Sequence, residues 1–518
     1  MIHNFNELGV LDRFNIREVA ELDTFTIEAG FLVFEDRNGR PCEVYAERCL
    51  LDGSDRPAVV HCVGGGQTVN RNDLLDWARK GFSSVSFDWQ IGNYSNHDPE
   101  KKSRWPEGVV SQINYLRNER EAVLPLAVRA AGACIDWLLD SGRINPEGIG
   151  VTGISWGGYL AWLVSAYEPR VKAAVPVYGC GGQFDPRHPG QFRLHPDIAA
   201  IWRDKWDPFS IVDRYSKPVC YLSATNDFFG ILPIANDLLN RLKVPCRRSW
   251  LPNCNHSISP GEDALGTAWL RHYLDGGPAL PEEPALHPDG TIEADQSEEV
   301  LSTETWWTPA LLDGDLGCWV RGHPGPGGTA AFGRVLYKDG FTMCTPLVFP
   351  SAEGETAPSN RQTVPSTYPD PVNGIGWNWG MGSTQFHTNW VRVETVAPGT
   401  TRLERDPGKD DDAPSFFLNQ FAHPAWNTGR QEAVILDVRT DPPEMIEKTD
   451  VILSLRGNAR VQEVRATLPL RDGKLELDLT TFPGLPELHT WRSVVRMEIL
   501  MQTRAKAFFV GPLKRVND

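Results

Sequence analysis

The sequence has no long apolar run and no excess of basic residues. No stretch of about 18 uninterrupted apolar residues occurs, so we expect no membrane-spanning helix. Lys and Arg number 51 against 67 Asp and Glu, and a net charge of -16 repels phosphate backbones, so nucleic acid is not an expected partner. The first residues lack the basic end and apolar core of a secretory signal. We therefore expect a cytoplasmic protein, with a signal already removed left open.

Cysteine is sparse and irregularly placed. Ten Cys occur, none after Cys344, and their spacing is not that of a disulfide framework. There is no HExxH, no CxxC pair and no EF-hand loop, so the sequence predicts no metal site and no cofactor. Cys62 and Cys220 lie in apolar runs typical of buried strands, where a free thiol packs as a small hydrophobe. This usage favours a reducing compartment.

The chain is long, and the spacing of its apolar residues changes partway along it. A single core covers about 100 to 200 residues, so 518 residues predict two or more domains. From about 57 to 275, short apolar runs alternate with amphipathic stretches, which predicts a doubly wound, mainly parallel α/β sheet. The helix expected over 119–141 has one apolar stripe, formed by Leu124, Val128, Ala131, Ile135 and Leu138.

Gly/Pro-rich turns characterise the rest of the chain. They separate alternating runs such as AVILDVRT and KLELDL, which predicts an all-β sandwich or jelly-roll-like domain. Two interruptions of the α/β pattern, near 90–118 and 180–210, are too long for tight turns and predict functional inserts. The predicted segments are a β-rich N-terminal extension (1–45), an α/β domain (46–280), an acidic, Pro-rich linker (281–303) and a C-terminal β-domain (304–518).

The sharpest motif is GISWGG, which begins at Gly153 and lies between the strand-like GIGV and the helix-like YLAWLVSAY. It is the pattern of a nucleophile elbow, in which a Ser occupies a strained strand-to-helix turn. Such a turn needs neighbours without Cβ atoms, and the elbow glycines Gly153 and Gly157 meet that need. Ser155 is therefore the candidate nucleophile. The alternative is a Gly-rich turn with an incidental Ser.

Two downstream residues complete a catalytic triad. A hydroxyl nucleophile needs a general base held by a third group, and in this type of fold the order is Ser, then Asp or Glu, then His. Asp227 follows the strand-like PVCYLSATN, and His256 follows RRSWLPNCN. Both lie where a strand opens into a loop at its carboxyl end, the edge at which open α/β sheets form sites. Taken singly, Asp227 also fits a helix cap and His256 a surface histidine.

An oxyanion hole is predicted from the loop after an early strand. The run PAVVHCV leads into Gly64-Gly65-Gly66, whose backbone can approach a tetrahedral intermediate closely. We assign one N–H donor to Gly65, with Gly66 as the alternative, and the other to Trp156, the residue after the nucleophile. No Lys-Ser or Lys-Thr follows the glycines, so a phosphate-binding loop is excluded. A simple strand-end turn remains the other interpretation.

These motifs, from about 45 to 278, resemble the α/β-hydrolase superfamily. The similarity rests on GISWGG, on LSATND with Asp227, on the His256 loop and on the closing helix AWLRHYLDGGPALP. Within the superfamily it is greatest to the branch of acetyl xylan esterases, dienelactone hydrolases and prolyl-oligopeptidase-type peptidases. Members often carry His-Gly at the oxyanion loop, where this chain has Val63 before Gly64. The resemblance implies acyl transfer without a metal.

The resemblance implies a serine hydrolase that cleaves carboxylic esters, including acetyl esters of carbohydrate, through an acyl-enzyme on Ser155. One alternative is a peptidase of the prolyl-oligopeptidase or X-Pro type. Its relatives usually carry a large propeller before the hydrolase, where this sequence has about 50 residues. A trailing β-domain resembles cocaine esterase and X-Pro dipeptidyl-peptidase relatives. The second alternative, a binding protein with a vestigial site, is disfavoured because all the motif residues are present.

Specificity is expected from the two inserts. Trp89 and Trp105, with Tyr94, and Trp202 and Trp206 are candidates for the walls of a substrate pocket; the favoured interpretation is that they pack the inserts onto the sheet. The C-terminal Trp-rich stretch GIGWNWGMGSTQFHTNW either stacks on sugar rings or packs in a core. The expected partner is a small-molecule or carbohydrate ester, and homo-oligomerisation is left open.

Overall fold

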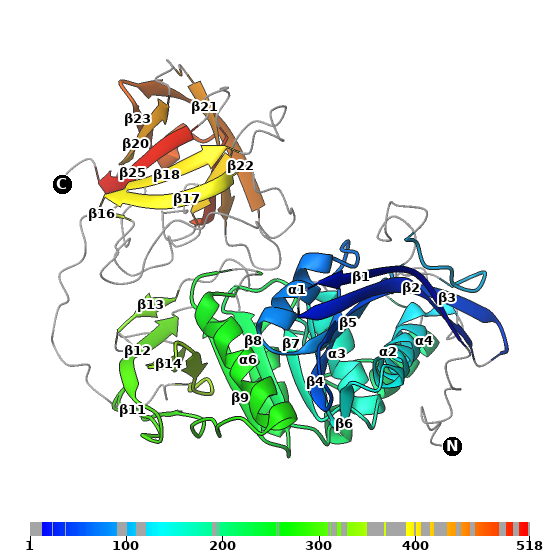
Figure 1. Cartoon of the computed structure of the whole chain (residues 1–518). Helices are drawn as coiled ribbons and strands as arrows, with labels where there is room; N and C mark the ends of the chain where they lie inside the picture. The colour runs from blue at the N-terminus through cyan, green and yellow to red at the C-terminus, as the bar shows by residue number, and fades with distance from the viewer. Residues whose placement is uncertain are drawn as a thin grey trace.

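Nine strands form one sheet in the first half of the computed structural model (Figure 1). Their order is β1-β2-β3-β5-β4-β6-β7-β8-β9. From β5 to β9 neighbouring strands run parallel, whereas β1, β2 and β3 join β5 in antiparallel pairs. The strands are β1 (Arg13–Leu22), β2 (Phe25–Glu35), β3 (Pro41–Leu51), β4 (Arg56–Cys62), β5 (Ser83–Phe87), β6 (Ile144–Ile154), β7 (Ala173–Val177), β8 (Val219–Ala224) and β9 (Cys246–Leu251).

The structure describes most of the first two thirds of the chain and the strands of the last third. The described residues are 13–90, 101–109, 121–188, 194–308, 311, 319–322, 329–349, 367–368, 390–397, 400–405, 415–418, 433–441, 446, 448–455, 462–485, 494–500 and 507–515, except 23, 37, 195, 255 and 257. Tyr94, much of the insert predicted near 90–118, and Trp377 and Trp379 of the C-terminal Trp-rich stretch lie outside them.

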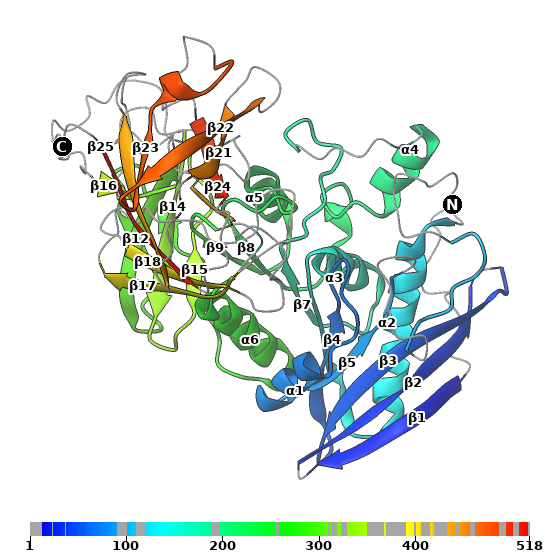
Figure 2. The ribbon, with the colours of Figure 1, turned by 90° about the horizontal axis from the view of Figure 1, so that it is seen from above.

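Helices cover both faces of the sheet (Figure 2). Side chains of a strand alternate between faces, and in β4 Val59 packs with the cluster that includes α1 and α6 residues, whereas Val60 packs with α2 and α3 residues. This two-sided burial explains why the central strands are apolar along their whole length. The helices are α1 (Arg71–Arg79), α2 (Val123–Asp140), α3 (Trp156–Tyr167), α4 (Pro196–Lys205), α5 (Leu232–Arg241) and α6 (Pro260–Asp275), with a 3-10 turn η5 (Val212–Arg214).

The predicted doubly wound, mainly parallel α/β class is confirmed. All five residues of the apolar stripe predicted for 119–141 are buried on α2. The parallel strands bring their carboxyl ends to one edge, which places the segments after β4, β6, β8 and β9 together. None of the helices in the described ranges combines the length and the apolarity that a membrane crossing requires.

A four-stranded antiparallel sheet follows the α/β unit and shares its core. Its order is β13-β12-β14-β15, and a two-stranded hairpin precedes it. Trp306, Trp319 and Phe332 belong to the same buried cluster as α2 and α3, and Val335 and Met343 to the cluster of α6. The elements are β10 (Ala285–Leu286), β11 (Ile292–Glu293), β12 (Val300–Thr308), β13 (Val320–Arg321), β14 (Ala330–Tyr337) and β15 (Thr342–Cys344).

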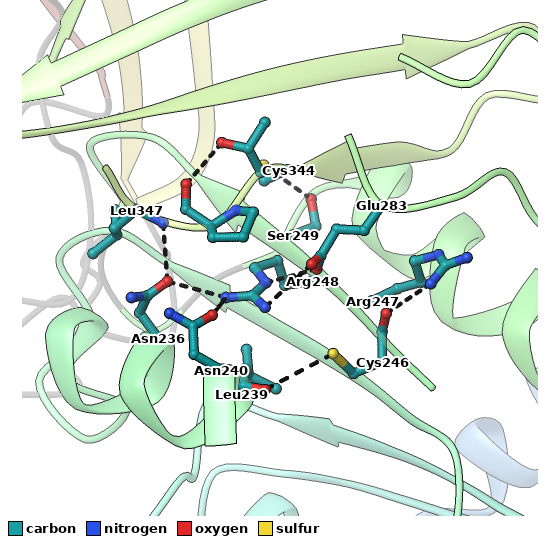
Figure 3. A network of polar contacts seen from close by, with 12 residues as sticks. Asn236, Leu239, Asn240, Cys246, Arg247, Arg248, Ser249, Glu283, Cys344 and Leu347 are labelled. Atoms are coloured by element: carbon teal, nitrogen blue, oxygen red, sulfur yellow. Dashed lines mark hydrogen bonds and ion pairs between the residues drawn. The ribbon is translucent and has the colours of Figure 1, made fainter. Parts of the chain in front are cut away.

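Buried polar contacts also join this sheet to the α/β unit (Figure 3). Arg248 on β9 donates to Asn236 and Asn240 on α5, at 3.0 and 2.9 Å, and pairs with Glu283 at 2.7 Å. The N–H of Leu347, just after β15, donates to the Asn236 side chain at 2.9 Å. The described residues of this segment, from Glu283 to Leu347, therefore contact the α/β unit directly. The linker predicted at 281–303 stays a prediction. A turn-rich sequence does not indicate that the residues after it pack into the same core as the α/β unit.

The last third is an all-β region with a core of its own. Ten strands form one sheet, nine along one path and β16 paired to β25 beside it. The buried residues of β20 to β24, such as Leu436, Leu453 and Ile499, form a separate cluster. The sandwich or jelly-roll arrangement stays a prediction. The strands are β16 (Thr367–Tyr368), β17 (Trp390–Ala397), β18 (Thr400–Arg405), β19 (Ser415–Leu418), β20 (Val434–Asp441), β21 (Lys448–Leu455), β22 (Gln462–Arg471), β23 (Lys474–Leu477), β24 (Val494–Leu500) and β25 (Ala507–Arg515), with a 3-10 turn η9 (Leu479–Thr481).

Candidate active site

Ser155 occupies the turn between β6 and α3 in a strained conformation. Its φ of 60° and ψ of -121° lie in a region that residues with a Cβ rarely adopt. The backbone holds the turn from both sides, since the Ser155 N–H donates to the Val177 carbonyl at 2.9 Å and the Tyr159 N–H donates to the Ser155 carbonyl at 3.0 Å. The side chain is half-buried at the start of a helix, the geometry expected of a nucleophile elbow.

The elbow depends on glycine at Gly153 and Gly157. A Cβ atom on Gly153 would lie 2.3 Å from the carbonyl oxygen of Gly157, and one on Gly157 would lie 2.0 Å from the carbonyl oxygen of Cys62. A third glycine, Gly158, lies equally close to the Val177 carbonyl, at 2.2 Å. Backbone atoms cannot rotate away as side chains can, so the three glycines let β4, β6 and β7 approach α3 closely.

Gly157→Ala should destabilise the protein by at least about 3 kcal/mol, because its methyl group would overlap the Cys62 carbonyl. The matched control is Gly132→Ala in α2, where the methyl would meet only the ends of two side chains, Glu168 at 3.1 Å and Arg170 at 3.6 Å. Helix propensity alone favours Ala over Gly by about 1 kcal/mol, so the control should be neutral or more stable than wild type. Urea unfolding measures both; equal stabilities would show that the elbow can relax around a Cβ.

Asp227 and His256 lie in direct contact. The Asp227 Oδ2 atom is 2.6 Å from His256 Nδ1, and the two side chains are almost fully buried. The other carboxylate oxygen, Oδ1, accepts hydrogen bonds from the backbone N–H of Phe229, at 2.8 Å, and of Gly230. Both oxygens are thus engaged, which stabilises a buried negative charge and fixes the direction from which the imidazole is held.

Aromatic rings hold the His256 imidazole on two sides. Its ring centre lies 4.2 Å from that of Tyr178 and 4.7 Å from that of Phe228. Tyr178 has φ of 68° and follows β7 directly, in the turn whose Val177 carbonyl accepts the Ser155 N–H. The same turn therefore contacts both the Ser155 backbone and the His256 ring. The catalytic roles of Ser155, Asp227 and His256 stay predictions.

The glycine loop after β4 is clamped by a buried glutamine. The Gly66 N–H donates to Gln90 Oε1 at 2.8 Å, while the Gln90 amide nitrogen donates to the Gly64 carbonyl. The Gly66 N–H is therefore occupied by an acceptor of the protein itself. Gly65 lies against the elbow, since a Cβ there would be 2.8 Å from Trp156 Cδ1, and in the described chain its N–H makes no hydrogen bond. Of the two predicted loop donors, Gly65 is therefore the one whose N–H is not already bonded among the described residues, and its role stays a prediction.

Asp88 is a buried carboxyl two residues before Gln90. Burial raises its pKa to about 6, although the Ser103 N–H donates to Oδ2 at 3.1 Å. Oδ1 has no hydrogen-bond partner among the described residues. Because the folded form binds this proton more tightly than an unfolded carboxyl with a pKa of about 3.9, stability falls as the pH rises from about 4 to 6.

Asp88→Asn should therefore raise the free energy of unfolding at pH 7 by up to about 2 kcal/mol and lose this advantage near pH 4. The exposed carboxylate of Asp140 provides the control, since Asp140→Asn removes one charge without relieving burial. Urea unfolding at pH 4, 5.5 and 7 checks the trend. A constant difference between Asp88→Asn and wild type over that range would contradict a buried, destabilising charge.

The four predicted pocket tryptophans are largely buried. Trp202 and Trp206 are each 1% exposed, and their ring centres lie 5.4 Å apart. The indole N–H of Trp202 donates to the Tyr159 hydroxyl at 2.8 Å. Trp89 is buried and donates to the Val63 carbonyl at 2.9 Å, whereas Trp105 is half-buried on the core. These contacts are those of packing, the favoured interpretation of the sequence. Their role as pocket walls stays a prediction.

Sequence reasoning missed the residues that support the site. Tyr178, Gln90 and Phe228 lie just beyond the carboxyl ends of β7, β5 and β8, and that position at the sheet edge is a signal that could have indicated them. His188 was also missed; it is buried in the second insert, hydrogen-bonds the Phe229 backbone, and burial lowers its pKa. In the described ranges, no three His, Cys, Asp or Glu side chains gather in a way that could hold a metal ion.

The α/β unit is similar to several known proteins. Residues 60–264 match the Dienelactone hydrolase family. A carboxymethylenebutenolidase-type protein of Methylorubrum extorquens is 29% identical over 30% of this chain and 44% of its own length. The carboxymethylenebutenolidase homolog of Rattus norvegicus is 23% identical over 39% of this chain and 69% of its own.

Among solved structures, an acetyl xylan esterase from Paenibacillus sp. R4 aligns with a TM-score of 0.42 and 16% identity, over 52% of this chain and 91% of that one. By contrast, this chain spans less than half the length of the Methylorubrum extorquens relative. Residues 60–264 include the elbow, Asp227 and His256 and end just inside α6. They match the Dienelactone hydrolase family and lie within a doubly wound, mainly parallel α/β fold of the α/β-hydrolase type.

Proposed function

We propose that the protein hydrolyses carboxylic esters through an acyl-enzyme formed on Ser155. The observation that carries the proposal is the 2.6 Å contact between Asp227 Oδ2 and His256 Nδ1, beside a turn that also holds the strained Ser155. The family match supports hydrolysis, and this contact supplies the base and the group that orients it.

In the proposed mechanism the Ser155 hydroxyl attacks the ester carbonyl while His256 takes its proton. Asp227 holds the imidazole by Nδ1 and stabilises the cation that forms. The Gly65 and Trp156 N–H groups donate to the oxyanion of the tetrahedral intermediate. His256 then protonates the leaving alcohol. Water, activated by the same base, attacks the acyl-enzyme and releases the acid, which restores the Ser155 hydroxyl.

The substrate class within the esters is the open part of the proposal. Acetyl esters of carbohydrate are the first candidates on the sequence resemblance. Two curated relatives, from Methylorubrum extorquens and Rattus norvegicus, are named as carboxymethylenebutenolidases, so a butenolide lactone, which is a cyclic ester, is the second. Amide cleavage by an X-Pro peptidase uses the same residues and is the alternative reaction.

Two measurements test the function together. A fluorophosphonate probe should label the folded protein, and peptide mass spectrometry should locate the label on Ser155; heat-denatured protein is the control, because labelling requires the assembled base. The second measurement is turnover of p-nitrophenyl acetate, butyrate and octanoate, acetylated xylan, a butenolide and an X-Pro anilide. Anilide cleavage faster than ester cleavage would favour the peptidase. Silence on every substrate together with an unlabelled Ser155 would support a vestigial site.

A further inference from the structure

The loop that carries His256 connects β9 to α6 and is bound first to the neighbouring Asp227 loop. The Asn226 N–H donates to the Cys254 carbonyl at 3.0 Å, and the Asn253 N–H donates to Thr225 Oγ1 at 2.8 Å. These bonds join the His256 loop to the Asp227 loop within the α/β unit. They leave the side chain of Asn253, three residues before His256, directed to other partners.

The Asn253 side chain binds the backbone of Trp319, which lies outside the matched family domain. Its Nδ2 donates to the Trp319 carbonyl at 2.7 Å, and its Oδ1 accepts the Trp319 N–H at 2.8 Å. Trp319 is itself fixed, because it is 2% exposed and its ring packs 5.0 Å from that of Phe332 on β14. A reciprocal pair of this kind fixes both the position and the orientation of the Asn253 amide.

Trp319 directly precedes β13 of the β12–β15 sheet. The same sheet also contacts the other end of the His256 loop, where α6 begins. Glu262 is fully buried, accepts the Ser259 N–H in a capping box, and pairs with Arg334 of β14 at 3.1 Å. Gly261 lies against β15, since a Cβ there would be 2.5 Å from the Thr342 hydroxyl. The β12–β15 sheet therefore contacts the His256 loop three residues before the histidine and again at the start of the helix after it.

We propose that the β12–β15 sheet positions His256 for catalysis and that Asn253 is the positioning residue through which it acts. The sheet begins after the family match ends at residue 264, and the network of Figure 3 anchors it to β9 and α5, so it provides a rigid reference. The inference rests on the proposed role of His256 as the base. A base displaced by about 1 Å can lose on the order of 100-fold in rate.

The variant that tests this is Asn253→Gly. Asn253 has φ of 55°, a conformation that Gly adopts freely, so the change removes both hydrogen bonds to Trp319 without straining the backbone. The matched control is Asn145→Gly. Asn145 accepts the Glu147 N–H at 2.9 Å at the start of β6, the end of that strand opposite Ser155.

For Asn253→Gly we expect kcat on p-nitrophenyl acetate to fall about 10- to 100-fold with KM unchanged, and the rate of fluorophosphonate labelling to fall in proportion. Asn145→Gly should match wild type. In a His256→Ala background, Asn253→Gly should cause no further loss, because its effect passes through His256. A loss of similar size in both backgrounds, or no loss in either, would overturn the proposal.

Amide hydrogen exchange separates this inference from the proposed function. Peptides covering 252–259 should exchange faster in Asn253→Gly than in wild type or Asn145→Gly, whether or not the protein turns over an ester. An unlabelled Ser155 in wild type would count against the proposed function alone. Unchanged exchange in Asn253→Gly would count against positioning by the sheet, even in a fully active enzyme.

Discussion

Ser155→Ala should lower kcat for p-nitrophenyl acetate by at least about 10⁴-fold and abolish fluorophosphonate labelling. The reason is chemical: without the hydroxyl no acyl-enzyme can form, and only oxyanion stabilisation and substrate positioning remain. The substitution should leave the fold intact, because the bonds that hold the elbow are made by the Ser155 backbone.

The matched control for this experiment is Ser165→Ala on the same helix, α3. Ser165 is buried, and its hydroxyl donates to the Trp162 carbonyl at 2.8 Å, so its removal tests the loss of a serine hydroxyl away from the elbow. We expect near wild-type turnover from it. Ester hydrolysis that survives Ser155→Ala at a comparable rate would show that the nucleophile is another group.

His256→Ala should lower kcat by on the order of 1000-fold or more while the protein stays folded. Without the imidazole, the Ser155 hydroxyl has no base and the leaving alcohol no acid. The Asp227 carboxylate would keep its backbone donors, Phe229 and Gly230, which limits the structural damage. Steady-state kinetics and thermal unfolding, measured on the same preparation, separate loss of chemistry from loss of fold.

His272→Ala is the control for that experiment, because His272 lies on α6 and contacts the Gly277 carbonyl at 3.0 Å rather than the site. Near-normal turnover in His256→Ala would show that another histidine serves as the base. His188, which hydrogen-bonds the Phe229 backbone next to Asp227, would then be the first residue to substitute.

Much of the α/β unit was predictable because its signals are local. A parallel sheet buries both faces of its central strands, so those strands appear in the sequence as short, wholly apolar runs. Helix α2 likewise shows its buried apolar residues at helical spacing. The elbow was equally readable, since its glycines are required by the close approach of α3 to Cys62 and Val177, and such a requirement constrains adjacent residues in the sequence.

The environment of each candidate residue was not predictable, because it depends on contacts between distant segments. Nothing in the order of the residues indicates that Gln90 occupies the Gly66 N–H, 24 positions away, or that Trp202 and Trp206 pack inside the core. The aromatic walls of His256 come from two separate loops, after β7 and after β8. Burial and pairing of this kind are properties of the assembled sheet edge.

By itself, the sequence determined the fold class and the chain order of Ser155, Asp227 and His256, because strand and helix periodicity and elbow glycines act over a few residues. Only the tertiary structure decided that Asp227 and His256 are in contact. It also decided that Asn253, in the His256 loop, hydrogen-bonds Trp319 beside the β12–β15 sheet. The physical reason is that a hydrogen bond between residues 66 positions apart leaves no periodic trace in a single sequence.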